Sequence, residues 1–523
     1  MAGGVAELMR HWPGILATGL VLFLTLGTLG AVVWRAESWG SLGQSDWAAI
    51  KFTILQALVS AFVSTALAIP VARALARRSF RGKSVLVTLL GAPFILPVIV
   101  AVLGLLTVFG RNGLISSVLV WFDLPPVQIY GFRGVVLAHV FFNLPLATRL
   151  ILQSWMSIPA ERFRLAASLG FTSKDMFHQI EIPVLKQVLP GAFAVIFVVC
   201  TTSFAVALAL GGGPNATTVE LAIYQAFRFD FDLGKAAQLA VVQFLICAIA
   251  ASLMLKVQVT GQMGRGLDRT TQRWDAAPAY LRIIDGFWIV LAGTFLVLPL
   301  AMVVGLGIPG LGALDMSIAL AMKRSLFVAV GSAGIAVFLA LSMAFLIQGL
   351  GHRKRAGVVE IAGYLAIAAS PMVVGVGLFI IIFPVTDPVA LALPITALIN
   401  ALMSLPFALR GLVPEVRKVT SDYARLADSL GLRGIQRLRV AYFPRLRRPI
   451  GFAAGLSAAL SMGDLGVVTL FADPGQATLP LQLYRLMAAY RMEEAAAVAL
   501  WLLVVSMLLF WVFDRGGRLN ASA

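Results

Sequence analysis

The chain has 523 residues, of which 60% are hydrophobic and only 12% are charged. Soluble proteins carry about twice that share of charged residues. The apolar residues come in runs of about 20, the length that crosses the hydrocarbon core of a bilayer. Composition therefore argues against a soluble enzyme and predicts an all-α polytopic membrane protein.

The formal net charge of +17 would suggest nucleic-acid binding in a soluble chain. Here Lys and Arg gather in short segments between apolar runs, where they set topology and meet anionic lipid head groups. The expected partner is therefore the lipid bilayer, and no nucleic acid.

Twelve apolar runs predict about twelve transmembrane helices. They lie near residues 14–34, 50–72, 85–109, 134–153, 189–210, 236–256, 285–307, 325–348, 357–383, 389–409, 450–471 and 495–513. The third and ninth runs contain Pro97 and Pro371, which predict kinks or breaks there. The first run is too long for a signal-peptide core, so we expect an uncleaved span.

The distribution of positive charge predicts the orientation. With the N-terminus inside, most of the 41 Lys and Arg residues fall on the inner side, including those of segments 73–83, 353–355 and 410–448. This bias predicts a multi-pass protein of a bacterial inner membrane with both termini in the cytoplasm.

A seven-residue segment occurs twice. RLAASLG at 164–170 recurs as RLADSLG at 425–431, 261 residues later, and the same offset pairs Pro145 with Pro406. The offset is half the chain length, which indicates a duplicated six-span unit. Six is even, so the two repeats are predicted to be parallel. The predicted domains are a first six-span unit at 1–258, a cytoplasmic linker at 259–284 and a second six-span unit at 285–523.

Each copy, here called an RLAxSLG loop, begins a longer pattern on the inner side. Its residues are Arg164, Leu165, Ala166, Gly170 and Pro183 in the first half, and Arg425, Leu426, Ala427, Gly431 and Pro444 in the second. The pattern predicts a short helix of small residues that a glycine ends. Thr172 or Ser173 is expected to cap a second short helix, which the proline ends.

The pattern resembles the EAA loop of binding-protein-dependent ABC-transporter permeases: Glu-Ala-Ala, three residues, Gly, about nine residues and Ile-x-Leu-Pro. The spacing to Gly and Pro agrees in both halves. Three departures stand out: Arg164 and Arg425 replace Glu, Leu165 and Leu426 replace the first Ala, and Ala441 replaces Ile. The alternative is a basic loop that recurs through duplication alone.

The resemblance implies a type I importer permease fold and assigns a role to the loops. Residues 163–170 and 424–431 would be coupling helices, each docked on one subunit of a cytoplasmic ATPase dimer. The chain would then be a translocation subunit, not an enzyme, and no cofactor is expected. Gly82-Lys83-Ser84 lacks the earlier glycine of a Walker A loop, since Arg77 stands there.

Two stretches indicate the substrate. Residues 201–240 and 462–491 resemble the permeases of thiamine importers, as do the fused layout and the length. Ferric-iron permeases share that layout and are the alternative. No metal-ligand cluster appears along the chain, so thiamine or its phosphates are favoured. In such importers a periplasmic substrate-binding protein supplies much of the selectivity.

Four polar residues are candidates for the pore or its gate. Asp464 is the one carboxylate well inside a predicted span, and Ser203 is its counterpart in the first half. An acid within the membrane is a functional candidate, although a position in a broken helix beside two glycines also accounts for Asp464. Asn143 and Asn400 either line the pore or join helices. Residues 211–214 are expected to end the fifth span, with a gate loop as the alternative.

A proton-coupled secondary transporter is the competing class, because it too can have twelve spans in two parallel halves. Such proteins carry several ionisable residues within the membrane. One carboxylate and two repeated docking loops argue against it.

Overall fold

The computed structural model describes residues 2–36, 42–91, 95–211, 213, 216–256, 278–313, 315–350, 353–366 and 369–518. Within these ranges every regular element is a helix. Ten helical stretches among them are long and apolar enough to cross a membrane, and Pro371–Ile382 is a shorter apolar helix. The protein is therefore an all-α polytopic membrane protein, as predicted.

The first half of the chain contains α1 (Ala2–Leu22), α2 (Thr28–Arg35), α3 (Gln44–Arg77), α4 (Lys83–Leu89), α5 (Val98–Phe109), α6 (Leu114–Trp121), α7 (Phe132–Met156), α8 (Ala160–Ser168), α9 (Ser173–Met176), α10 (Ile182–Thr201), α11 (Ala205–Leu210), α12 (Val219–Arg228) and α13 (Leu233–Lys256). The second contains α14 (Ala279–Gly310), α15 (Met316–Gly349), α16 (Arg353–Leu365), α17 (Pro371–Ile382), α18 (Ala392–Ser429), α19 (Gly434–Gln436), α20 (Phe443–Met462), α21 (Gly466–Phe471), α22 (Leu479–Ala488) and α23 (Met492–Arg518). Five-residue π-helical turns, Phe23–Gly27 and Phe177–Glu181, and a six-residue one, Arg437–Tyr442, join consecutive helices.

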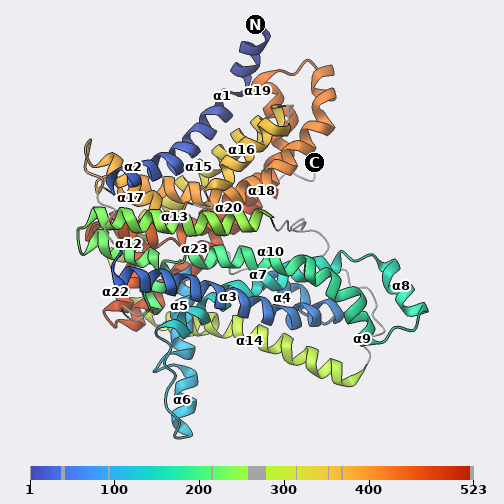
Figure 1. Cartoon of the computed structure of the whole chain (residues 1–523), viewed down its shortest axis with the longest axis vertical. Coiled ribbons are helices and arrows are strands. Elements are labelled where there is room, and N and C mark those ends of the chain that lie inside the picture. The colour runs from blue at the N-terminus through green and yellow to red at the C-terminus, as the bar shows by residue number, and fades with distance from the viewer. Residues whose placement is uncertain are drawn as a thin grey trace.

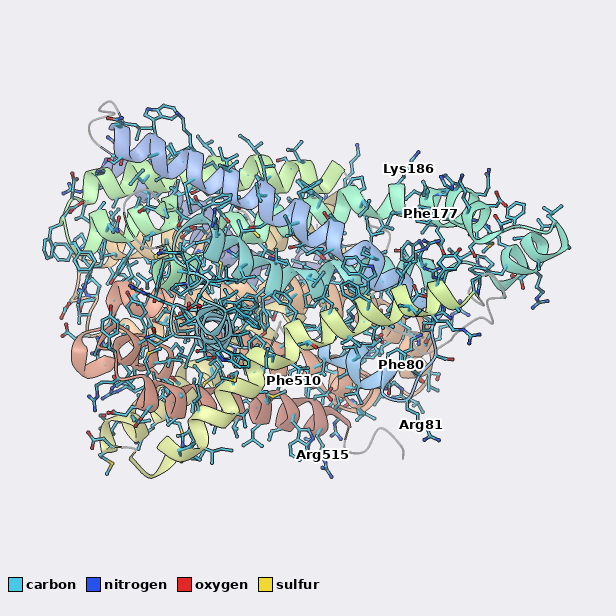
Figure 2. The ribbon with its side chains drawn as sticks, turned by 90° about the horizontal axis from the view of Figure 1, so that it is seen from below. Phe80, Arg81, Phe177, Lys186, Phe510 and Arg515 are labelled. Atoms are coloured by element: carbon cyan, nitrogen blue, oxygen red, sulfur yellow. The ribbon has the colours of Figure 1, made fainter. Side chains whose placement is uncertain are left out.

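The central long helices run side by side along one direction, the horizontal in Figure 1. Helices α8 and α9 project at one end, whereas α12 and α22 lie at the opposite end. Helix α6 leaves the bundle sideways. Arg81 and Lys186 both lie toward the end that carries α8 and α9 (Figure 2). The helix α8, which contains the first RLAxSLG loop, thus lies at the opposite end of the bundle from α12 and α22 (Figure 1).

The predicted breaks in the third and ninth runs are confirmed. Pro97 is the N-cap of α5, and Pro371 opens α17, because a proline cannot continue a helix but suits its first turn. The run 450–471 is broken too: its helix ends at Met462 and resumes at Gly466, which agrees with the broken-helix alternative for Asp464.

The first helix of each half packs against the other half. Helix α14 lies against α3 and α5, while α1 lies against α15 and α2 against α17. Backbones approach closely there: a Cβ on Gly104 would lie 2.6 Å from the carbonyl oxygen of Pro299, and one on Gly14 would lie 2.6 Å from that of Ser342. Small residues allow such approaches between membrane helices. The two halves are therefore interlocked, and residues 257–277 of the predicted linker lie outside the described residues.

Candidate functional site

The first RLAxSLG loop forms the separate helix α8. Pro159 precedes it as the N-cap. Within the helix, Ala166 is only 2% exposed, whereas Leu165 and Leu169 are 60% and 63% exposed. Residues four apart share one face of a helix. The loop therefore rests on its alanine and presents two leucines outward, with Arg164 also exposed.

Gly170 ends α8 as predicted, with a φ of +68°. The N–H of Phe171 donates to the carbonyl of Ala166 at 3.0 Å, and the N–H of Gly170 donates to that of Ala167 at 3.1 Å. This pair of bonds is the Schellman motif, whose left-handed residue is usually glycine because a Cβ would clash.

The second loop repeats this arrangement. Gly431 has a φ of +63°, and the N–H of Leu432 donates to the carbonyl of Ala427 at 2.9 Å. Ala427 is 1% exposed, while Leu426 and Leu430 are 52% and 64% exposed. Arg425 is exposed too. The same leucine face is thus built twice, and we call each one a leucine pair.

The second loop differs from the prediction in one respect. It is not a separate short helix but the last two turns of the 38-residue α18. The positions that correspond to 157–159 are 418–420, and they contain no proline. Nothing there interrupts the hydrogen bonds of the helix, so it continues into the loop.

The predicted cap of the next helix is confirmed in the first half. The hydroxyl of Thr172 accepts from the N–H of Asp175 at 3.3 Å, and the N–H of Thr172 donates to the Asp175 carboxylate at 2.9 Å. This reciprocal pair is a capping box. Arg433 holds the N-cap position of α19 without a side-chain cap.

The two prolines do not end these elements, contrary to the prediction. Pro183 and Pro444 lie in the first turns of α10 and α20, directly after π-helical turns. Residues 173–201 form one continuous helical stretch. A π turn re-spaces the backbone bonds, so the proline ring is accommodated without a break.

Ion pairs lie behind both loops, with a buried acid in the first half and an exposed one in the second. The Arg73 Nε donates to the Glu181 carboxylate at 2.7 Å, and Glu181 is 1% exposed. In the second half, Arg437 contacts Asp428 at 2.8 Å and donates to the Tyr442 hydroxyl at 2.7 Å. Ionic hydrogen bonds with such geometry are stronger than neutral ones.

The pore candidates Ser203 and Asp464 occupy equivalent breaks, between α10 and α11 and between α20 and α21. The Asp464 carboxylate accepts from the N–H of Gly466 at 3.1 Å. A Cβ on Gly463 would lie 2.9 Å from the Cα of Pro97 in the first half. The structure therefore places Asp464 in a broken helix, where the two halves meet, and not inside a continuous span.

Asn143 and Asn400 are both buried and both join helices. The Asn143 amide donates to the Cys200 Sγ at 3.3 Å, from α7 to α10. The Asn400 amide donates to the Ser461 Oγ at 3.0 Å, from α18 to α20. Their contacts agree with the interhelical alternative.

Glu220 was not among the candidates predicted from the sequence. It is fully buried in α12, outside the ten spans, and accepts from the Gln243 amide at 3.0 Å. Burial raises the pKa of Glu220 to about 8. Hydrogen bonds from Ser370 and Gln243 lower this pKa, but the effect of burial is larger. Its only sequence signal is an acid in the first turn after Thr218, which caps the helix.

The chain has long relatives among curated proteins. It is similar to the "Thiamine transport system permease protein ThiP" of Brucella abortus (strain 2308), with 36% identity over 536 residues that cover all of this chain and 96% of the relative. The protein of the same description from Escherichia coli (strain K12) is 38% identical and covers 98% of both chains. That from Haemophilus influenzae is 32% identical over 96% of this chain and 95% of its own. No protein-family model matches the chain.

Proposed function

This chain belongs to the family of thiamine transport system permease proteins, and on that premise we propose that it is the membrane-spanning subunit of an ATP-driven importer of thiamine and its phosphates. Similarity along the whole chain carries the substrate assignment. The subunit moves its substrate and leaves ATP hydrolysis to a partner. It needs no cofactor for this.

The partner we propose is a cytoplasmic ATPase dimer, one subunit for each RLAxSLG loop. Two leucine pairs support this, because exposed apolar residues four apart are what a helix presents to a groove. Arg164 and Arg425 would lie at the edge of each contact. The buried Ala166 and Ala427, with the glycine stops, keep the loops in shape.

The proposed setting is the bacterial inner membrane, with both termini and both RLAxSLG loops in the cytoplasm. Arg81 and Lys186 lie toward the loop end, which agrees with the positive-inside rule. The opposite end, with α12 and α22, would then face a periplasmic substrate-binding protein.

We propose two permease units, 1–258 and 285–523, which exchange their first helices. Element bounds support the duplication: α10 and α11 are separated at 202–204, and α20 and α21 at 463–465, the same positions after the offset of 261. Closure of the ATPases would move the two packed bodies against each other. Ser203 and Asp464, at the breaks, are the residues we assign to the pathway.

Growth of a thiamine auxotroph tests the function. A strain without this chain should fail on low external thiamine, and rescue should need the chain, its ATPase and its binding protein together. Normal thiamine growth combined with a defect under iron limitation would overturn the substrate assignment. Rescue without the ATPase would instead indicate an ion-coupled transporter.

A further inference from the structure

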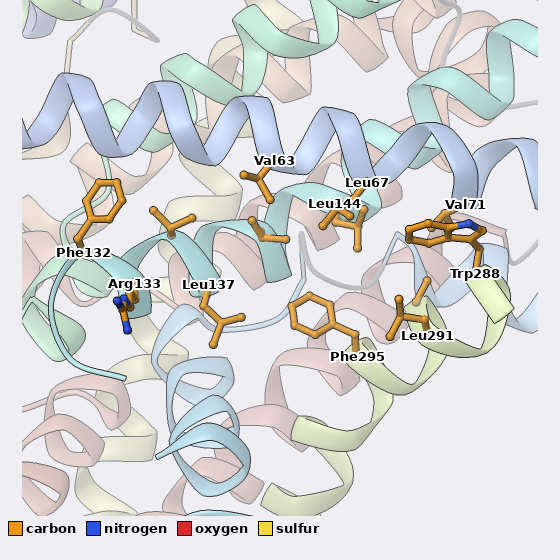
Figure 3. A pocket seen from close by; sticks show the side chains of 13 residues that line it. Val63, Leu67, Val71, Phe132, Arg133, Leu137, Leu144, Trp288, Leu291 and Phe295 are labelled. Carbon is orange, nitrogen blue, oxygen red and sulfur yellow. The ribbon is translucent and has the colours of Figure 1, made fainter. Parts of the chain in front are cut away.

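A lateral groove runs along the first half of the bundle, between α3, α7 and α14. Its volume is about 460 Å³, within the roughly 300–1,000 Å³ range of small-molecule sites. Its walls are almost entirely apolar: Val140 and Leu144 are buried lining residues of α7, and Phe295 lines the α14 side (Figure 3). Leu291, on its rim, is 45% exposed. The groove is therefore open to whatever surrounds the bundle.

The groove is about as long as the hydrocarbon region of one bilayer leaflet is thick. Phe132 and Arg133 lie at one end and Trp288 lies toward the other (Figure 3). From Phe132 to Leu144, both lining residues, α7 rises about 18 Å at 1.5 Å per residue. One leaflet of the hydrocarbon core is about 15 Å thick, half of the whole. An acyl chain aligned with the bundle would thus fill the groove from end to end.

A second cavity, of about 640 Å³, continues from the Arg133 end. It shares Arg133 and Leu137 with the groove and adds Arg111 and the chain segment 125–129. Among the residues that line the two cavities none is acidic. Two guanidinium groups therefore stand at the mouth of an apolar groove without a carboxylate between them.

The exposed aromatic residues of α6 indicate that this mouth lies at the depth of the lipid head groups. Trp121 and Phe122, at its end, are 82% and 64% exposed, and α6 points away from the bundle (Figure 1). The Ser116 hydroxyl ties α6 to the cavity wall: it donates to the carbonyl of Gly110 at 2.7 Å and accepts from the N–H of Val127 at 3.0 Å. Exposed tryptophans on membrane proteins concentrate at the bilayer interface.

We propose that the two cavities form one binding site for an anionic phospholipid. One acyl chain lies in the groove between α3, α7 and α14, and the phosphate lies between Arg111 and Arg133. Arginine suits a phosphate because its planar group donates two parallel hydrogen bonds. A net negative head group is favoured because no carboxylate offsets the two cations.

The site is expected once per chain. The offset of 261 pairs Arg111 with Met372 and Arg133 with Pro394, so the second half lacks both cations. The bound lipid would contact α14 and α3 together, at the place where a helix of the second half packs on the first. Lipid binding would therefore strengthen the interlock between the halves.

Native mass spectrometry of the purified full chain tests the proposal. Phosphatidylglycerol and phosphatidylcholine with identical acyl chains would be added separately to the detergent-solubilised protein. The wild type should retain one phosphatidylglycerol, at least about ten-fold more tightly than phosphatidylcholine. Arg111→Ala/Arg133→Ala should remove that preference, and Leu137→Trp should reduce binding of both lipids by filling the groove. Lys51→Ala, an exposed cation near the start of α3, is the control and should behave as the wild type.

Equal retention of the two lipids by the wild type, or an unchanged preference in the double variant, would overturn the proposal. A second measurement does not depend on the folding of those variants. Phosphatidylglycerol brominated near its chain ends should quench Trp288 fluorescence, measured as the difference between wild type and Trp288→Phe. Equal quenching by brominated phosphatidylcholine at the same low mole fraction, or displacement of the lipid by thiamine pyrophosphate, would also overturn it.

Discussion

Gly170 and Gly431 end equivalent helices in the two RLAxSLG loops, and both hold a left-handed backbone, with φ of +68° and +63°. No atom lies within 4 Å of a Cβ built on either residue. A substitution there acts through backbone strain of roughly 1–2 kcal/mol and not through packing. Its effect should therefore stay within the loop.

We predict that Gly170→Asp or Gly431→Asp leaves the protein inserted at wild-type levels but reduces co-purification of the ATPase. The asparagine variants should be milder, because Asn tolerates this conformation. Gly411→Asp is the matched control, since Gly411 is exposed in α18 and has open space around it but no positive φ. Wild-type co-purification in both aspartate variants would show that the loops do not dock.

The leucine pairs give a sharper test of docking. Leu165→Ser combined with Leu426→Ser should weaken ATPase binding by about ten-fold or more, because each buried leucine contributes about 1.5–3 kcal/mol. Thermal stability of the isolated chain should change little, since both side chains are more than half exposed. Val120→Ser, on the exposed face of α6 at a distance from the loops, should leave binding unchanged. Binding is measured by titration of the ATPase onto the immobilised permease.

The interlock of the halves rests partly on Asp285 of α14. Its carboxylate accepts from Arg77 at 3.0 Å and from Arg78 at 2.7 Å, and Asp285 is 2% exposed. Asp285→Ala leaves buried positive charge without its partner, so we predict that the free energy of unfolding falls by about 3–5 kcal/mol. Glu360→Ala removes a half-exposed pair with Arg417 and should cost about 0–1 kcal/mol. Denaturant unfolding in the same detergent compares them; equal losses would contradict the structural role of Asp285.

Glu220 predicts a pH dependence of stability. Its pKa rises from 4.5 to about 8 in the folded protein. The folded state thus binds the proton more tightly than the unfolded state, and the contribution of this group falls as pH rises from about 4.5 to 8. Glu220→Gln stays neutral and keeps the hydrogen bond to Gln243, so it serves as the reference. The melting temperature of the wild type should fall relative to that of the variant as pH rises over this range. Parallel pH profiles of the two proteins would contradict a raised pKa.

Local sequence was enough to predict the helical fold, the breaks at Pro97 and Pro371, and the glycine stops of both loops. Each depends on residues within a few positions of one another. Local rules failed in two places. A π-helical turn accommodates Pro183, so that the proline does not end the helix, and α18 continues into the second loop because no proline precedes that loop.

Long-range contacts lay beyond sequence reasoning. The pairing of Asp285 with Arg77 joins residues 208 positions apart. The glycines beside Asp464 offered a broken helix in the run 450–471 only as an alternative, since the apolar composition suits a continuous span equally well. The packing of the first helix of each half against the other half likewise has no local signature.

ATP-dependent uptake of labelled thiamine into proteoliposomes tests the central claim most directly. The vesicles would contain this chain and its ATPase, with the binding protein added outside and ATP enclosed. We predict uptake that requires all three proteins and ATP. Unlabelled thiamine pyrophosphate should compete with the labelled thiamine, whereas ferric citrate should not. The Leu165→Ser/Leu426→Ser variant should take up much less thiamine than the wild type at a limiting concentration of the ATPase. Uptake that persists without the ATPase, or no thiamine uptake by the complete wild-type system, would contradict the account.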